Sequence, residues 1–348
     1  MADKPRENLF GLLTSDPNRV YVIAEAGVNH GGKKERALAL VRAAKWAGAD
    51  AVKFQTFRAD RLASTQRAAL AHTKDQPNLQ ELFKKLELPF DTFRALHKEA
   101  ERVGIEFLST PFDEESADFL DELGVNAFKI ASGDITHRPL IEHVAGKGKP
   151  VLLSTGMSAP EEIEKAIDWM HTRSNEQIVL LHCVASYPAK PEELNLKSVE
   201  YLRDRFGVPV GFSDHSVGGL GSVVATSLGA QVIERHFMIE TRGETPDQAV
   251  SMDAKALKIH IEDLHRIGTL LGERGKFATE AESRNKTASR RALYARRPIA
   301  AGETIDADML YALRPANGIS PEFFESVVGK QALRPIQADA PVQWESIQ

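Results

Sequence analysis

Short apolar runs alternate along the chain with longer segments in which apolar residues recur at every third or fourth position. The runs are typical of buried strands, and the recurring spacing is typical of amphipathic helices. Strands that alternate with helices form a parallel sheet, and eight such units close into a (β/α)8 TIM barrel. The pattern predicts eight strands, at residues 20–27, 49–55, 105–110, 127–132, 150–155, 178–183, 208–213 and 231–236.

The segments between these runs predict the helices of the barrel. Clear examples are "KKERALALVRAAKWAG" (33–48) and "APEEIEKAIDWMH" (159–171), and the last barrel helix is expected at residues 254–271. Glycine follows several of the segments, as at Gly104, Gly124 and Gly229, which is where helices commonly end. Residues 56–90 form an insertion with one short predicted helix, "LQELFKKL" (79–86).

The tail of the chain differs from the barrel pattern. From Arg291 onward the segments are short and rich in turn residues, and "RPIAAGETIDADML" (297–310) is echoed by "RPIQADAPVQWESI" (334–347). This echo favours a small β-rich domain with pseudo-twofold structure. We therefore expect a catalytic TIM barrel over residues 1–272, a polar linker over 273–290 and the small domain over 291–348.

Composition excludes several classes of protein. The sequence has no apolar run long enough to span a bilayer and no secretory signal at its start, so we expect a cytoplasmic protein without a membrane partner. A net charge of -5 gives no electrostatic footprint for nucleic acid. The single cysteine, Cys183, excludes an internal disulfide.

Polar side chains stand at the ends of the predicted strands. Active sites of TIM barrels form at these carboxyl ends, so the side chains should meet at one mouth. The polar residues in question are Glu25, Lys53, Gln55, Thr110, Lys129, Ser132, Ser154, Thr155, Ser213, His215 and His236.

Lys53 and Lys129 predict an anion site. A single lysine near the end of a buried strand is better explained by extension of its ammonium to solvent. Two lysines accompanied by several hydroxyls favour a phosphate or carboxylate ligand instead.

The two histidines predict a metal site. Strands seven and eight are neighbours about 5 Å apart, so His215 and His236 can share one divalent cation, completed by water and substrate oxygens. Asp214 could supply a third ligand or orient an imidazole. The alternative is two histidines that are hydrogen-bonded in the mouth without any metal. His182 and Cys183 are interpreted as buried residues of strand six.

Together these groups suit the chemistry of an anionic substrate and a carbonyl compound. A cation polarises a carbonyl oxygen, lysines hold a phosphorylated acid, and a carboxylate such as Glu25 handles protons. Condensation of phosphoenolpyruvate with an aldehyde meets these requirements, as does the reaction of an ordinary metal-dependent aldolase.

The motifs at the strand ends resemble those of the sialic acid synthase family, which includes N-acetylneuraminate, legionaminate and pseudaminate synthases and spore coat polysaccharide biosynthesis protein E relatives. The C-terminal "RRALYARRPIAAGE" and "LRPANGI" are similar to the family's antifreeze-like (SAF, β-clip) domain. The matching barrel motifs are "IAEAGVNHGG" (23–32), "DAVKFQTF" (50–57), "FLSTPFD" (107–113), "FKIASGD" (128–134), "LLSTGMS" (152–158), "LHCVASYP" (181–188), "GFSDHS" (211–216) and "ERHF" (234–237).

The resemblance implies a metal-dependent condensation, with Mn²⁺ or Mg²⁺, of phosphoenolpyruvate with an open-chain N-acylated amino sugar. The acceptor would be N-acetylmannosamine or a diacetylated 6-deoxyhexose, and the product a nine-carbon 2-keto acid for surface polysaccharide biosynthesis. Glu25 would position or deprotonate a water, and His215 and His236 would hold the metal. Phosphoenolpyruvate would be bound by Lys53, Thr110, Lys129, Ser132, Ser154 and Ser213.

The resemblance also implies the sugar contacts and the assembly. Gln55, Tyr187 and Asp247 would meet the sugar, and Arg314 would reach the mouth from the SAF domain of a partner subunit. The implied assembly is a domain-swapped homodimer.

Three departures from the family pattern fall on the sugar side. Gln248 stands where a histidine is common, Asp134 where glutamate is frequent, and residues 184–186 read Val-Ala-Ser in a segment that is often polar. They leave the metal and phosphoenolpyruvate residues intact but put the identity of the sugar in question.

Two further functions are compatible with a barrel of this kind. A synthase of 3-deoxy sugar acid phosphates would need more basic residues for a second phosphate and has no SAF tail. A non-catalytic binding module would be expected to have lost Lys53, Lys129, His215 or His236, and all four are present.

Overall fold

The structure is a computed structural model that describes residues 9–16, 18–65, 78–240 and 245–348. It divides into two compact units, Met1–Gly272 and Glu273–Gln348, which are described separately below. The segment 273–290, expected as a linker, contains the helix α12 (Glu280–Ser289).

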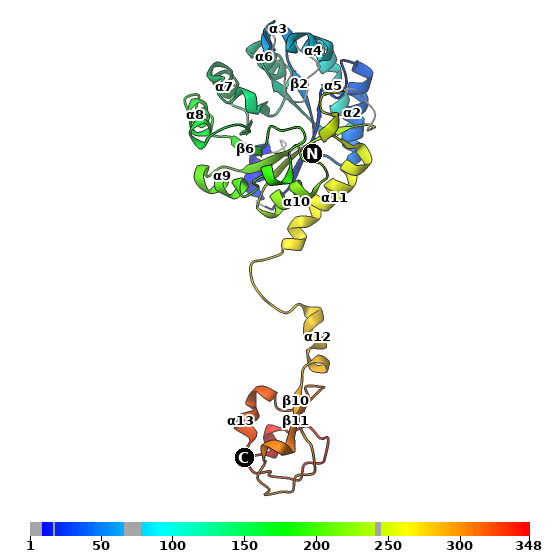
Figure 1. The fold of residues 1–348 in the computed structure, drawn as a ribbon, viewed down its shortest axis with the longest axis vertical. Coiled ribbons are helices and arrows are strands. Elements are labelled where there is room, and N and C mark those ends of the chain that lie inside the picture. The colour runs from blue at the N-terminus through cyan, green and yellow to red at the C-terminus, as the bar shows by residue number, and fades with distance from the viewer. Residues whose placement is uncertain (1–8, 17, 66–77, 241–244) are drawn as a thin grey trace, which may run out of the picture. The chain divides into compact units, whose positions relative to one another are not determined.

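The first unit contains eight parallel strands that run in the order β3-β2-β1-β8-β7-β6-β5-β4, and β3 lies next to β4 at the remaining gap (Figure 1). All eight strands predicted from the sequence are therefore present, and the TIM-like barrel is confirmed. Their bounds are β1 (Tyr21–Gly27), β2 (Ala51–Thr56), β3 (Glu106–Pro111), β4 (Phe128–Ile130), β5 (Val151–Ser154), β6 (Ile178–Cys183), β7 (Val210–Asp214) and β8 (Val232–Met238).

Helices surround the strands in Figure 1. Several end at a glycine in the left-handed conformation, including Gly104 and Gly124 as expected. The insertion supplies α3 and α4, and a two-residue strand β9 (Met252–Asp253) pairs with the end of β8. The helices are α1 (Leu9–Ser15), α2 (Lys34–Ala47), α3 (Ala59–Leu62), α4 (Leu79–Leu86), α5 (Phe90–Val103), α6 (Glu114–Leu123), α7 (Arg138–Ala145), α8 (Pro160–His171), α9 (Ser198–Phe206), α10 (Leu220–Ser227) and α11 (Ala254–Leu271).

Two apolar layers explain why the strands read as nearly continuous hydrophobic runs. One layer lies between the strands and the surrounding helices, and the other fills the inside of the barrel at the amino ends of the strands. Strands buried on both faces need apolar residues at successive positions. The inner layer includes Leu9 and Leu13 of α1, so this short helix closes the bottom of the barrel.

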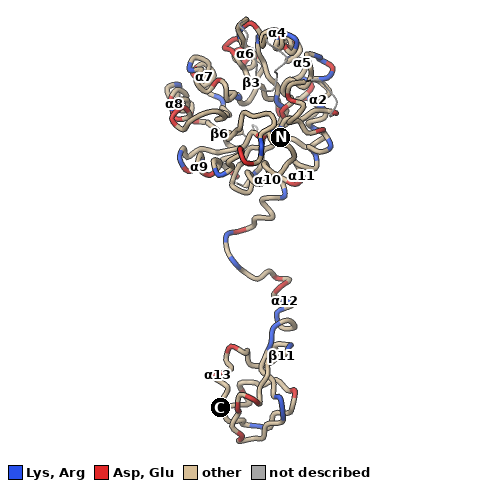
Figure 2. Tube along the Cα trace, viewed as in Figure 1, with Lys and Arg blue, Asp and Glu red and all other residues tan. Residues whose placement is uncertain are grey.

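The surface of the barrel is mixed in charge. Figure 2 shows basic and acidic residues interspersed along the outer helices. Each helix in the described part of the chain is too short or too polar to cross a membrane.

The second unit is a small β-rich fold, as the sequence predicts. Its named elements after α12 are β10 (Ala292–Ala295), β11 (Leu310–Leu313) and α13 (Phe324–Val327), and β10 pairs with β11 in antiparallel fashion. The sequence echo has a structural counterpart. Ile299 and Ile336 occupy the same place in the two copies and exchange backbone hydrogen bonds of 2.9 Å in both directions.

We expect the closure by α1 to be a substantial part of barrel stability. Replacing Leu13, which is 1% exposed, by alanine removes buried methyl groups and leaves a cavity, so it should lower the free energy of unfolding by about 3 kcal/mol. The urea-induced unfolding transition of the barrel measures this change in free energy. Leu12 lies on the same helix and is half-buried, so Leu12→Ala is the control and should cost clearly less. Equal losses would contradict a specific role for the buried face of α1.

Candidate active site

The strand register brings the predicted residues together at the carboxyl ends of the strands. Glu25 on β1 lies beside Lys53 on β2 and beside His236 on β8. Ser213 on β7 lies beside Glu234 on β8. Because alternate residues of a strand point to opposite faces, Glu234 and His236 share the inner face with Ser213 and His215.

Lys53 is the centre of a buried charge cluster. Its Nζ lies 2.9 Å from Oε2 of Glu25 and 3.5 Å from Oε2 of Glu234, and it donates a hydrogen bond of 3.2 Å to Oγ1 of Thr110. Ser213 donates a hydrogen bond of 2.8 Å to Oε1 of Glu234. All five side chains are buried, so the charges interact without screening by bulk water.

Glu234 was not among the residues predicted from the sequence. The signal that could have found it is the period of two along β8, since Glu234 stands two positions before His236 and must share its face. Only the last residue of the apolar run was given a role, and Glu234 was treated as part of the strand interior.

The two carboxyl groups of the cluster have very different pKa values. Burial raises the pKa of Glu25 to about 7, against the attraction of Lys53. Burial also opposes the charge on Glu234, but Lys53, Lys129 and the hydrogen bond from Ser213 outweigh it and lower its pKa to about 2. Two nearby carboxyls with such different pKa values suit an acid–base group beside a permanent anion.

Lys129 completes the basic side of the mouth. Its Nζ donates to the backbone oxygen of Ile130 at 3.0 Å, and burial lowers its pKa even though Glu234 attracts the charge. Lys53 has a raised pKa, because the attraction of Glu234 and Glu25 exceeds the effect of burial. The pKa values of the two lysines in the mouth are therefore shifted in opposite directions.

The remaining predicted anion ligands lie at neighbouring strand ends. Ser154 ends β5, and its buried Oγ has no hydrogen-bond partner. Ser132 follows β4 and accepts a hydrogen bond of 3.0 Å from the backbone N–H of Gly156. An orphaned buried hydroxyl such as that of Ser154 is suited to binding a ligand.

His215 and His236 lie side by side in the mouth, with ring centroids 5.3 Å apart. Nδ1 of His215 is 2.9 Å from the backbone oxygen of Val184, which can only accept, so Nδ1 carries the proton and Nε2 has the lone pair. Nδ1 of His236 lies 3.5 Å from Oδ2 of Asp247. Burial lowers the pKa of His236 and favours the neutral ring.

This arrangement fits a divalent cation. Metal-binding histidines generally direct one ring nitrogen to a protein oxygen and the other to the metal. The described residues contain no cluster of three or more histidine, cysteine or acidic side chains able to hold an ion, so two protein nitrogens would be completed by water and substrate. An open site of that kind is typical of a catalytic metal.

Asp214 is neither a third ligand nor a partner of an imidazole. Its carboxylate points to the outer face of the strand and lies 2.9 Å from NH1 of Arg235. It also accepts hydrogen bonds from Ser216 and Ser222. His182 faces outward as well, where Nε2 is 2.7 Å from the backbone oxygen of Leu194, so its interpretation as a buried core residue fits.

The loop after β8 carries Asp247 into the mouth. Asn29 holds this loop: it accepts a hydrogen bond of 2.6 Å from Thr245 and donates one of 2.8 Å to Ser251. Gly27 makes room for the approach, since a Cβ there would lie 2.8 Å from Oδ2 of Asp247. Its φ of 50° is also a left-handed conformation that favours glycine.

The other sugar-side predictions are placed differently. Tyr187 stacks on His215 with ring centroids 4.1 Å apart. Gln55 is half-buried on β2 beside Thr110. Arg314 is an exposed residue of the second unit, just after β11, and is described only within that unit.

The three departures from the family pattern follow three different strands of the barrel. Asp134 follows β4, and burial raises its pKa to about 6 against the attraction of His137 and Lys129. Gln248 begins the short 3-10 helix η3 (Gln248–Val250) directly after Asp247. Ala185 is exposed in the loop between Cys183 and Tyr187.

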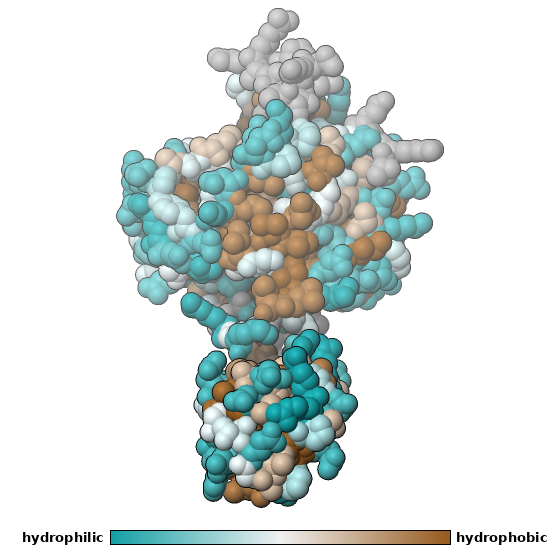
Figure 3. Space-filling model, turned by 60° about the horizontal axis from the view of Figure 1, so that its bottom comes forward, coloured by the Kyte–Doolittle hydropathy of each residue, from teal (hydrophilic) through white to brown (hydrophobic). Residues whose placement is uncertain are grey.

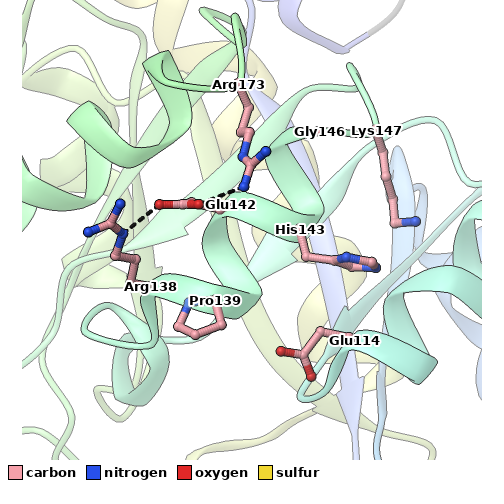
Figure 4. A pocket seen from close by; sticks show the side chains of 8 residues that line it. All are labelled: Glu114, Arg138, Pro139, Glu142, His143, Gly146, Lys147 and Arg173. Atoms are coloured by element: carbon pink, nitrogen blue, oxygen red, sulfur yellow. Dashed lines mark hydrogen bonds and ion pairs between the residues drawn. The ribbon is translucent and has the colours of Figure 1, made fainter.

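A surface pocket of about 650 Å³ lies away from the mouth, between α6, α7 and the end of α8 (Figure 4). Its charged side chains satisfy one another. Glu142 accepts hydrogen bonds from Arg138 at 2.5 Å and Arg173 at 2.7 Å, and Lys147 donates to Asp118 at 2.6 Å. This pocket is a surface ion-pair network, and the buried mouth remains the candidate site.

Comparison with known proteins agrees with this geometry. A model of the NeuB family matches residues 40–276, and a model of the SAF domain matches residues 290–348. The chain is 39% identical over 336 residues to the N,N'-diacetyllegionaminic acid synthase of Legionella pneumophila, with 94% of each protein covered. It is 33% identical to a pseudaminic acid synthase of Campylobacter jejuni, covering 94% of this chain and 96% of the relative.

A solved structure extends the likeness to three dimensions. The N-acetylneuraminic acid (sialic acid) synthetase of Leptospira borgpetersenii is 32% identical with a TM-score of 0.70. The match covers 77% of this chain and 90% of that protein.

Glu25 should titrate near neutral pH in the metal-free protein. Its carboxyl group should be protonated at pH 5 and lose its proton as the pH rises through about 7. The infrared band of the protonated carboxyl, taken as the difference between the wild type and Glu25→Gln, measures the midpoint. Lys53→Met removes the cation that favours the carboxylate, so it should move the midpoint higher.

The surface residue Glu99 provides the control for this titration. Its arginine partners lower its pKa to about 2, so the Glu99→Gln difference should show no band over the same pH range. A midpoint for Glu25 near its ordinary value of 4.5 would mean that Lys53 outweighs burial and would contradict the assignment.

Proposed function

We propose, from the premise that the chain belongs to the NeuB family and ends in an SAF domain, that it condenses phosphoenolpyruvate with an open-chain N-acylated amino sugar. The product would be a nine-carbon, sialic-acid-like 2-keto acid, released with inorganic phosphate. Support comes from relatives named as legionaminic and pseudaminic acid synthases, which are sugar acid synthases. An enzyme of this broad type is thus indicated, and the substrates are our proposal.

The observation that carries the proposal is the buried charge cluster at the barrel mouth. Lys53 lies within 3.5 Å of both Glu25 and Glu234, and Lys129 is buried nearby. Burying so many charges is costly unless they are paired with one another or with a ligand. Two buried lysines beside the unpartnered hydroxyl of Ser154 suit a small anion as the ligand of this mouth.

Phosphoenolpyruvate would be bound by residues of five strand ends. Lys53 and Lys129 supply charge, and the hydroxyls supply short donors to phosphate and carboxylate oxygens. Thr110 accepts a hydrogen bond from Lys53, so its own O–H can donate to a ligand, whereas Ser213 would exchange its hydrogen bond to Glu234 for one to the ligand. Ser132 and Ser154 complete this set of donors.

His215 and His236 would hold Mn²⁺ or Mg²⁺. When bound there, the ion would act as a Lewis acid toward the aldehyde oxygen of the sugar. The backbone oxygen of Val184 accepts a hydrogen bond from His215 and orients its ring, and the carboxylate of Asp247 lies 3.5 Å from Nδ1 of His236.

Glu25 would handle the proton of the water that is consumed. C3 of phosphoenolpyruvate forms a bond to C1 of the sugar, whose aldehyde oxygen takes the proton that the Glu25 carboxyl carries. Water then adds at C2 and gives its proton to the Glu25 carboxylate. The C2–O bond to phosphate breaks, and the proton of the new C2 hydroxyl leaves with the phosphate, which forms the 2-keto group. A carboxyl group with a pKa of about 7 can accept and return a proton near neutral pH.

Gln55, Tyr187 and Asp247 would contact the acceptor sugar. Tyr187 and Asp247 stand beside the two histidines, where the sugar aldehyde must lie. The departures at Asp134, Ala185 and Gln248 follow β4, β6 and β8 at the mouth, so we propose an N-acylated acceptor that differs among family members, such as N-acetylmannosamine or a diacetylated 6-deoxyhexose.

We also propose a domain-swapped homodimer in which Arg314 of one subunit reaches the mouth of the other. One face of the barrel unit gathers hydrophobic side chains (Figure 3). Val217, just before α10, and Leu220, at its start, are each 74% exposed. Exposed apolar surface of this kind commonly marks an interface with another protein.

Phosphate release tests the reaction. With Mn²⁺ and phosphoenolpyruvate, one acceptor from a panel of N-acetylmannosamine and the diacetylated 6-deoxyhexoses should give release. His215→Ala and His236→Ala should lower the rate by about 100-fold or more, because each removes half of the proposed metal site. His143→Ala, on the surface pocket, is the control and should retain the wild-type rate. Tight binding of phosphoenolpyruvate without release for any acceptor would overturn the proposed acceptor class.

Subunit mixing tests the role of Arg314. Lys53→Met and Arg314→Ala chains should each be inactive alone. The two chains are co-expressed in equal amounts and purified as one mixture of dimers. Half of these dimers are mixed and each mixed dimer has one intact mouth, so the mixture should recover about a quarter of wild-type activity. Activity that stays as low as that of the single variants would mean that Arg314 does not act across subunits.

A further inference from the structure

We propose that Arg235 is a positioning residue that sets the separation of His215 and His236. The inference rests on the proposed metal function of these histidines. Arg235 stands directly before His236 on β8 and therefore points to the opposite face of the strand. It is 1% exposed, and its guanidinium is directed at the backbone that carries His215.

The guanidinium donates hydrogen bonds to the backbone on both sides of His215. NH1 donates a hydrogen bond of 3.0 Å to the backbone oxygen of Asp214, and NH2 donates one to the backbone oxygen of Ser216. The planar fork of arginine offers two donors at a fixed spacing, which a lysine ammonium cannot reproduce. One side chain of β8 thus fixes the backbone from which the histidine of β7 projects.

Asp214 holds the guanidinium in place. Its Oδ1 lies 2.9 Å from NH1 of Arg235 and also accepts from the backbone N–H of Ser216 at 2.8 Å. Its Oδ2 accepts from the hydroxyl of Ser222 on α10 at 2.6 Å. The carboxylate is therefore bound on both oxygens, and only Nε of the buried guanidinium lacks a hydrogen-bond partner among the described residues.

A buried polar pair joins β7 to β8 on each face of the two strands. Ser213 bonds to Glu234 on the inner face, and Asp214 bonds to Arg235 on the outer face, at the next step of the same register. His215 and His236 follow at the next inner step. The distance between the imidazoles is set by two buried polar pairs below them, and the outer pair holds His215 from behind.

Arg235→Lys is the main test, because it keeps the buried charge but loses the fork. Binding of Mn²⁺, followed by the loss of its free-ion paramagnetic resonance signal, should weaken by about 10- to 100-fold. Binding of phosphoenolpyruvate without metal should weaken less than Mn²⁺ binding, since Lys53 and Lys129 project from β2 and β4 and not from the backbone that Arg235 holds. Hydrogen exchange of the backbone amides over residues 215–222 should become faster in the metal-free variant.

Two further variants keep the test decisive. Arg203→Lys is the matched control, since Arg203 also donates to a backbone oxygen at α10, that of Leu228, but is exposed. It should leave Mn²⁺ affinity unchanged. If Arg235→Lys fails to fold, Ser222→Ala removes one support of Asp214 without stranding a charge. It should weaken Mn²⁺ binding in the same direction and by less.

The outcomes separate this inference from the proposed function. Wild-type affinity for Mn²⁺ in Arg235→Lys would overturn the inference and leave the metal site standing. A wild-type protein that binds no Mn²⁺ would overturn the proposed metal function. In that case exchange over residues 215–222 decides the inference alone, and unchanged protection in Arg235→Lys would overturn it.

Discussion

The active end of this barrel depends on one constraint, the balance of charges that are buried together. Lys53 stands between Glu25 and Glu234, and neither the lysine nor either carboxyl reaches bulk water. An ion that is taken out of water must be compensated by a nearby charge or hydrogen bond, or it becomes neutral. Glu25 is the group that becomes neutral, while Glu234 keeps its charge because two lysines and a serine hydroxyl surround it. The acid–base character of the site follows from this competition.

The rest of the unit holds these charges in register. Apolar side chains on both sides of the strands, with α1 closing the bottom, leave the carboxyl ends as the place where polar side chains can gather. Parallel pairing then fixes which residues meet, so that Glu25 faces both Lys53 and His236. Loops contribute the remaining groups, and each loop needs its own anchor. Asn29 anchors the loop of Asp247, and Arg235 anchors the loop of His215.

The sequence was sufficient to predict the barrel, because eight buried strands each leave a continuous apolar run and each run ends in polar residues. It also located Lys53, Lys129 and the two histidines, whose places at strand ends are unusual for charged or titratable side chains. Glu234 and Arg235 were not predicted because the apolar run was treated as one buried segment. Its alternate residues were not assigned to the inner and outer faces of the strand. Asp214 was assigned to the mouth for the same reason, since adjacency to His215 in sequence places it on the opposite side. The helix α1 was missed because a short apolar segment at the start of a chain has no period long enough to identify it. The role proposed for Arg314 would depend on a second copy of the chain, which no local pattern can specify.

The two-faced structure of β8 also limits how such a protein can diversify. Because successive residues alternate between the mouth and the outer layer, an insertion or deletion of one residue before Glu234 would turn Arg235 into the mouth and move both Glu234 and His236 out of it. The strands can therefore vary only by substitution, and a substitution of Glu234 or Arg235 disturbs a buried charge. Asp247, Gln248 and Ala185 lie instead in loops, where a change in length or composition leaves the register of the barrel untouched. The loops around the mouth can thus change while the strands keep the buried charges of the mouth in register.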